Sequence, residues 1–167
     1  NSCAGCHLRN HRRYGPPKRD TGTTGQSKTT ASHGGVYRTK FFEEAAFCSG
    51  CHQFPQEYAI NGKPLQNTFV EWRASPQAAR GITCQSCHMP DRKHLWRGIH
   101  DPEMVAAGLT VRFHADGEAA RFDLTNSGVG HAFPTYVTPK VVMHAVALDA
   151  KGQPRPETAR SHVIQRI

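Results

Sequence analysis

The sequence predicts short helices and loops for residues 1–108, followed by a small antiparallel β unit in residues 109–167. Helical patterns in the first part are short and separated by Gly- and Pro-rich stretches, whereas beyond Gly108 apolar and polar residues alternate. Only 37% of the 167 residues are hydrophobic and 8% are aromatic. That is little for a self-sufficient core, so we expect bulky apolar cofactors to fill part of the interior.

Residues 1–14 hold a cysteine motif and a basic cluster, and residues 15–35 are rich in Gly, Pro, Ser and Thr, which predicts a long loop. A helix is expected over residues 40–53. Thr68 is expected to cap a further helix, with Glu71 completing a capping box.

The last helix of the first part is expected to begin at Asp101, with Pro102 in its first turn and Gly108 at its end. The β unit follows, with strand-like alternation over residues 109–114, 121–125, 142–148 and 163–167. Four strands make a small sheet, and we expect this β-rich segment to be incomplete.

All six cysteines belong to C-x-x-C-H motifs, and none is left over. The two thiols of such a motif have the spacing of the two vinyl groups of one haem, to which they can form thioether bonds. The adjacent histidine then lies under the iron as its proximal ligand. The motifs predict three c-type haems, with thioethers at Cys3, Cys6, Cys48, Cys51, Cys84 and Cys87 and proximal ligands at His7, His52 and His88.

A C-x-x-C pair can also be half of a zinc site, a redox dithiol or a local disulfide. Histidine is 11 of the 167 residues. By composition, histidine would follow all three pairs by chance in about a few sequences in ten thousand. A zinc site built from two C-x-x-C pairs would leave the third pair without a partner pair, so the pattern favours haem.

Three low-spin haems would need three distal ligands, and the abundance of histidine favours bis-histidine iron. His94 follows His88 too closely to pass around the same porphyrin, so we expect it to bind a neighbouring haem. His100 precedes a helix cap, His131 lies in a glycine-flanked loop, and His33 lies in the polar loop before the second motif. These four histidines are the distal candidates.

The formal charge of +8 suggests acidic partners or an anionic surface. Haem propionates would lower the charge to about +5, so the remaining basicity suits propionates and redox partner proteins. No nucleic-acid-binding motif is present. No apolar run approaches the roughly 18 residues of a membrane span.

The second and third motifs with their flanking residues resemble exported bacterial multihaem cytochromes of the cytochrome c554-related type. The resemblance covers roughly residues 33–150, including the segments Phe47–His52, Asn67–Arg73, Cys84–Pro90 and Gly130–Thr135, together with His94, Gly98 and His100. In many such proteins the haem segments precede a β-sandwich with a Gly-His-x-Phe-Pro-Thr loop. The resemblance implies that His131 is an axial ligand and that His94 or His100 is a second.

Electron transfer between redox partners is the function that the sequence predicts, with a carrier favoured over an enzyme. One alternative is an oxidoreductase with one haem open to substrate. Another is a subunit of a larger electron-conducting assembly of multihaem cytochromes, in which surplus histidines ligate haems across chain boundaries. Covalent haem attachment takes place outside the cytoplasm, which predicts a periplasmic or extracellular location.

Overall fold

The computed structural model describes residues 2–26, 34–116 and 119–167. The chain forms two compact units. The first comprises Asn1–Gly50 with Gly81–Arg97, and the second comprises Cys51–Arg80 with Gly98–Ile167. The second unit therefore contains residues from both sides of the boundary expected at residue 108. Within it, Arg166 donates to the carbonyl of Pro64 (2.7 Å), and residues Gln66 and Tyr136 form a β-bridge.

The first unit carries a four-stranded sheet of very short strands in the order β1-β2-β4-β3. These strands are β1 (Leu8–Arg9), β2 (Arg12–Gly15), β3 (Gly25–Gln26) and β4 (Tyr37–Arg38). The β1–β2 turn contains Asn10 and His11, both at positive φ, as a tight hairpin with right-handed twist requires. Part of the region expected to be loop is thus sheet, held by pairings between distant residues that no local pattern reveals.

Short helices precede and follow the strands of this sheet in the sequence. They are α1 (Cys3–His7), η2 (Lys40–Glu43), α2 (Ala46–His52), α5 (Cys84–His88) and η4 (Pro90–Arg92). The helix expected over residues 40–53 is interrupted, because Glu44 has an extended conformation between η2 and α2. Thr39 begins the first piece by accepting a hydrogen bond from the Phe41 amide.

The helices of the second unit are η3 (Gln56–Tyr58), α3 (Thr68–Arg73), α4 (Pro76–Ala79), α6 (Pro102–Gly108) and η5 (Pro156–Thr158). Asp101 caps α6 as expected, accepting a hydrogen bond from the Met104 amide (3.0 Å). The prediction of a capping box at Thr68 and Glu71 is wrong. Asn67 occupies the cap position of α3 without a side-chain bond, and the Glu71 carboxylate binds elsewhere.

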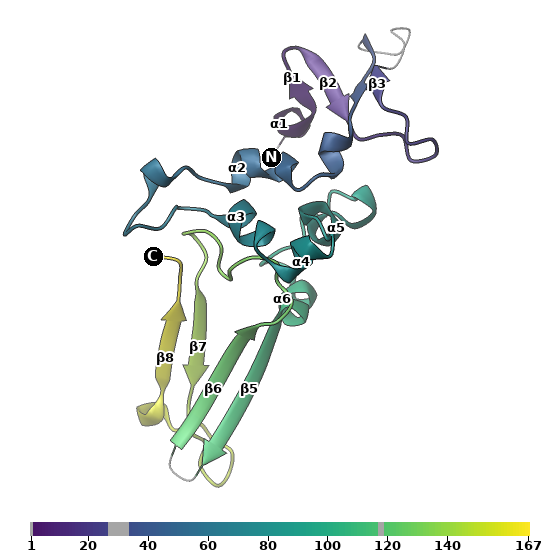
Figure 1. The fold of residues 1–167 in the computed structure, drawn as a ribbon. Helices are drawn as coiled ribbons and strands as arrows, with labels where there is room; N and C mark the ends of the chain where they lie inside the picture. The colour runs from purple at the N-terminus through teal and green to yellow at the C-terminus, as the bar shows by residue number, and fades with distance from the viewer. Residues whose placement is uncertain (1, 27–33, 117–118) are drawn as a thin grey trace. The chain divides into compact units, whose positions relative to one another are not determined.

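The β-rich residues form two antiparallel hairpins. One pairs β5 (Leu109–Asp116) with β6 (Ala119–Asn126), and the other pairs β7 (Val141–Ala145) with β8 (Arg160–Ile164) (Figure 1). Phe113 lies opposite Phe122, and Val111 lies opposite Leu124. Alternation therefore gives the β5–β6 hairpin one apolar face and one polar face.

Little of the chain is buried. Ala45 is the buried hydrophobic residue of the described ranges, at 3% exposure, and no large side chain in them is completely buried. The accessible surface is 12013 Å². A compact protein of 18.5 kDa exposes about 8,200 Å², and two separate bodies of the same total mass expose about 10,000 Å². The chain therefore buries less of its surface than a compact protein of its mass does.

None of the helices in the described part of the chain has the length and apolar character that crossing a bilayer requires. α2 and α6, for example, have seven residues each.

Two glycines let the loop after β6 pack closely on the end of α6. A Cβ on Gly128 would lie 2.7 Å from the carbonyl oxygen of Ala107, and one on Gly108 would lie 2.6 Å from Val129 Cγ2. We predict that Gly128→Ala lowers the free energy of unfolding by about 1–3 kcal/mol, because the backbone must shift. Gly15→Ala is the control, since its Cβ would meet Val36 at an ordinary 3.5 Å. Denaturant unfolding of both variants checks this, and equal stability would contradict it.

Candidate haem-binding site

Each cysteine motif occupies about one turn of helix. The motif is the whole of α1 and of α5, and it forms the last five residues of α2. Residues i, i+3 and i+4 of a helix lie on one face. Both thiols and the histidine of each motif therefore share a side, which is the arrangement needed for two thioether bonds to one haem edge and an imidazole beneath its iron.

The histidines of all three motifs are oriented through Nδ1. His7 Nδ1 donates to the carbonyl oxygen of Tyr14 (2.7 Å), and His88 Nδ1 donates to the carbonyl oxygen of Arg97. Gln66 Nε2 lies 2.8 Å from His52 Nδ1 and 3.1 Å from the Thr68 hydroxyl, so the amide nitrogen donates to both and His52 Nδ1 is the acceptor.

An Nδ1–H donor bond fixes the imidazole tautomer in which Nε2 carries the lone pair. Metal-bound histidines almost always have such a bond to a carbonyl or carboxylate, which orients the ring and raises its basicity. The ring orientation of His7 and His88 thus fits a proximal ligand of haem iron. At His52, the Gln66 amide would have to turn its oxygen towards Nδ1 for Nε2 to be free to bind iron.

The third motif lies against the segment that leads into the second. Gln85 Nε2 donates to the carbonyl oxygens of Phe42 (3.0 Å) and Glu44 (2.7 Å), and Arg92 forms an ion pair with Glu43. No disulfide joins the six cysteines. A hydrogen bond with the Cys48 thiol lowers the pKa of Cys84 despite its partial burial.

Burial raises the pKa of the Cys87 thiol, and the neighbouring charge of Cys84 adds to the effect. The two cysteines of this motif therefore differ in acidity, with Cys84 the more readily ionised.

His94 lies beside the proximal histidine of the first motif. The ring centres of His94 and His7 are 6.1 Å apart, with 54° between their planes. Metal–imidazole bonds of about 2.0 Å, with about 1.1 Å from Nε2 to the ring centre, put two imidazoles on opposite faces of one metal about 6 Å apart. The distance between the ring centres of His7 and His94 is therefore compatible with both histidines binding one iron.

His131 is oriented in the same way as His7 and His88. Its Nδ1 donates to the carbonyl oxygen of Ala132 (2.8 Å), which favours the tautomer with the lone pair on Nε2. The loop is fixed at its start by Asn126, whose side chain donates to the His131 carbonyl (2.7 Å) and accepts from the Val129 amide (3.0 Å).

Glu71 anchors this loop to α3, and sequence reasoning missed that role. Its carboxylate accepts hydrogen bonds from the Ala132 amide (3.1 Å) and the Thr135 hydroxyl (2.7 Å), and it forms an ion pair with Arg166 (2.7 Å). Burial raises the pKa of Glu71, but the bonds from Thr135, Arg166 and Ala132 outweigh burial, and the pKa lies below its ordinary value of 4.5. The charged carboxylate therefore stabilises the fold above that value, and the stabilisation is lost as the pH falls through the lowered pKa.

The other histidines are placed differently. His100 is exposed in the turn before α6, and His33 lies outside the described residues. His114 is exposed and lies 3.4 Å from Asp123. His144 Nδ1 lies 2.8 Å from the Ser161 hydroxyl. The structure thus brings His94 to a motif histidine and orients His131 through Nδ1, while His100 shows neither feature.

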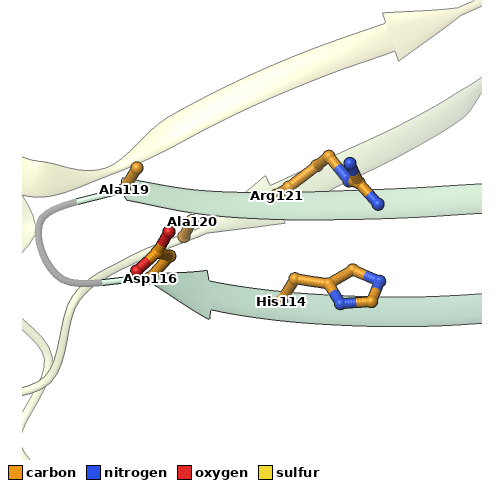
Figure 2. Close-up of a pocket in the computed structure, with 5 residues that line it drawn as sticks. All are labelled: His114, Asp116, Ala119, Ala120 and Arg121. Carbon is orange, nitrogen blue, oxygen red and sulfur yellow. The ribbon is translucent and has the colours of Figure 1, made fainter.

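A shallow pocket near the tip of the β5–β6 hairpin contains no candidate ligand. Figure 2 shows its lining residues, which are His114, Asp116, Ala119, Ala120 and Arg121. Within residues 2–26, 34–116 and 119–167, no three His, Cys, Asp or Glu side chains gather in a way that could hold a metal ion. The candidate site is therefore the three motif helices and the histidines associated with them.

The chain matches no family model, no curated protein and no solved structure. The resemblance stated from the motifs accordingly stays a prediction.

Gln66 offers a way to test whether His52 binds iron. Gln66→Glu replaces the amide donor at His52 Nδ1 with a carboxylate acceptor, which raises the basicity of the imidazole and stabilises ferric iron. We predict that it lowers the reduction potential of one haem and that Gln66→Leu, which supplies no acceptor, does not. Spectroelectrochemical titration measures both.

Gln56→Glu adds the same charge at an exposed position whose side chain binds the Gly62 carbonyl. It is the matched control. Potentials that respond equally to the two glutamates would show that only charge matters and that His52 is not a ligand.

Proposed function

We propose that this protein carries three covalently bound haems and transfers electrons between redox partners outside the cytoplasm. The observation that carries the proposal is that all three C-x-x-C-H motifs are helical and that each motif histidine has Nδ1 at a hydrogen-bond partner. Haem iron bound here would accept and donate one electron at a time by cycling between its ferric and ferrous states. The chain holds the groups in place and sets their potentials through ligands, burial and charge.

Exposed apolar side chains near the motifs support a bulky apolar cofactor. Phe41, Leu95 and Trp96 are 44%, 53% and 45% exposed. Covering such surface stabilises a protein by about 25 cal/mol per Å². Porphyrin rings attached to the neighbouring helices would cover it, and so supply the burial that the polypeptide lacks.

Arg38 supports a negatively charged group in the first unit. Its Nη1 donates to the Pro16 carbonyl (3.0 Å), while its Nε is buried and has no acceptor among the described residues. A buried donor without a partner costs about 1–3 kcal/mol. A haem propionate would satisfy it, in line with the basic composition of the chain.

The nearness of His94 to His7 supports electron transfer at the haem of the first motif. A catalytic haem needs one open face for substrate, whereas two imidazoles on one iron would leave none there. The proposed partners are other redox proteins, among them multihaem cytochromes, and the proposed location is periplasmic or extracellular.

Intact-mass measurement tests the central proposal. The protein purified from a host that attaches haem should exceed the polypeptide mass by three haem masses. The Cys84→Ser/Cys87→Ser double variant should retain two. A wild-type mass equal to that of the bare polypeptide, or increased only by a metal ion, rejects the proposal.

Removing His94 should leave the iron of the first haem without one of its two imidazole ligands. We predict that the reduced wild-type protein binds no carbon monoxide, and that His94→Ala binds one molecule per chain with a shift from low to high spin in the oxidised form. His114→Ala is the control, since that exposed imidazole lies on β5. Optical titration with carbon monoxide measures this. Binding by the wild type would favour an enzyme, and no binding by His94→Ala would refute the ligand assignment.

A further inference from the structure

Both backbone groups of Ala132 are held. Its carbonyl oxygen, in the peptide unit shared with Phe133, accepts the proton of His131 Nδ1 (2.8 Å), and its amide, in the peptide unit shared with His131, donates to Glu71 Oε2 (3.1 Å). The two peptide units meet at the Cα of Ala132, so the bond to Glu71 helps to fix the residue whose carbonyl orients the His131 ring. The Glu71 carboxylate therefore influences the direction of the imidazole through the Ala132 backbone.

The Glu71 carboxylate is itself fixed. Arg166 Nη1 bonds Oε1 (2.7 Å) while its Nε bonds the Pro64 carbonyl (2.7 Å), and the side chains of Arg166 and Glu71 are 8% and 19% exposed. Thr135, 9% exposed, adds a bond to Oε2 (2.7 Å). Each carboxylate oxygen is thus occupied, and the group cannot rotate without breaking bonds that are shielded from water.

The same network reaches the proximal histidine of the second motif. From Glu71 it runs through Thr135 to the Thr68 hydroxyl (2.9 Å), then to the Gln66 amide (3.1 Å) and His52 Nδ1 (2.8 Å). One continuous set of hydrogen bonds within the second unit therefore orients both of its candidate iron ligands. A carboxylate whose task was only to tie α3 to the C-terminal segment would need Arg166 and no bond to the loop.

We propose that Glu71 is a positioning residue that holds His131 in the orientation of an axial ligand to haem iron. This inference rests on the proposed function, since it requires a haem for His131 to bind. Glu71 itself does not touch the iron. It acts through the backbone of Ala132, whose amide donates to Glu71 and whose carbonyl accepts from His131, and Arg166 and Thr135 fix the carboxylate for that purpose.

Three variants of the full haem-loaded protein test the proposal by electron paramagnetic resonance of the oxidised form. Glu71→Ala should convert one of the three low-spin haems to high spin. Glu71→Gln should stay largely low spin, because its amide oxygen can still accept the Ala132 and Thr135 protons. Glu57→Ala, which removes an exposed carboxylate of the same unit, should match the wild type.

The double variant Glu71→Ala/His131→Ala separates positioning from general stability. If Glu71 acts through His131, the double variant should have the spectrum of His131→Ala alone. An additional high-spin haem in the double variant would overturn the proposal. Should Glu71→Ala yield no loaded protein, Thr135→Val, which removes one bond to the carboxylate at nearly constant volume, is measured instead and should show a smaller change of the same kind.

Intact mass distinguishes the two proposals. A protein without three haems fails the proposed function. A protein with three haems whose Glu71→Ala variant, or Thr135→Val in its place, keeps the wild-type low-spin spectrum leaves that function standing and overturns the role of Glu71.

Discussion

A shortage of buried apolar surface is the constraint on which the rest of the structure depends. The conformational entropy lost on folding is about 1–2 kcal/mol per residue for the backbone, and burial of apolar side chains normally offsets it. Here Ala45 is the buried hydrophobic residue of the described ranges. A chain with this composition needs another source of burial, and covalent haems at three sites spread along residues 3–88 would provide it where it is required.

Hydrogen bonds and ion pairs fix side chains and loops that apolar packing would fix in an ordinary core. The Nδ1 bonds of His7 and His88 end on backbone carbonyls, so their orientation depends on how the chain folds back after each motif. The Glu71–Arg166 pair does the same for the loop that carries His131. Removing one partner of a largely buried ion pair typically costs about 3–5 kcal/mol, because the other charge is left unpaired. Such contacts give orientation as well as stability, and an iron ligand needs orientation most.

Local patterns predicted the elements that local physics controls. The Asp101 cap and the Pro102 first turn of α6 involve residues within one turn of each other. The alternation beyond Gly108 corresponds to β5 and β6, and the structure extends both strands towards the hairpin tip. The prediction for Glu71 failed for a physical reason. A capping box and a distant loop compete for one carboxylate, and three bonds from Ala132, Thr135 and Arg166 outweigh the single one that a cap would provide.

The sequence by itself carries the proposal of haem chemistry, because attachment to one haem edge requires two thiols and an imidazole within five consecutive residues. It also gives the histidines that are candidates for second ligands. Only the tertiary structure decided which of these histidines lie near a motif or are held by hydrogen bonds. Three contacts show this. His94 lies beside His7, a hydrogen bond orients His131, and Glu71 forms an ion pair with Arg166. Each depends on the path of the backbone or on a partner far along the chain. Sequence spacing does not predict such contacts, because they arise from the way the chain folds back on itself.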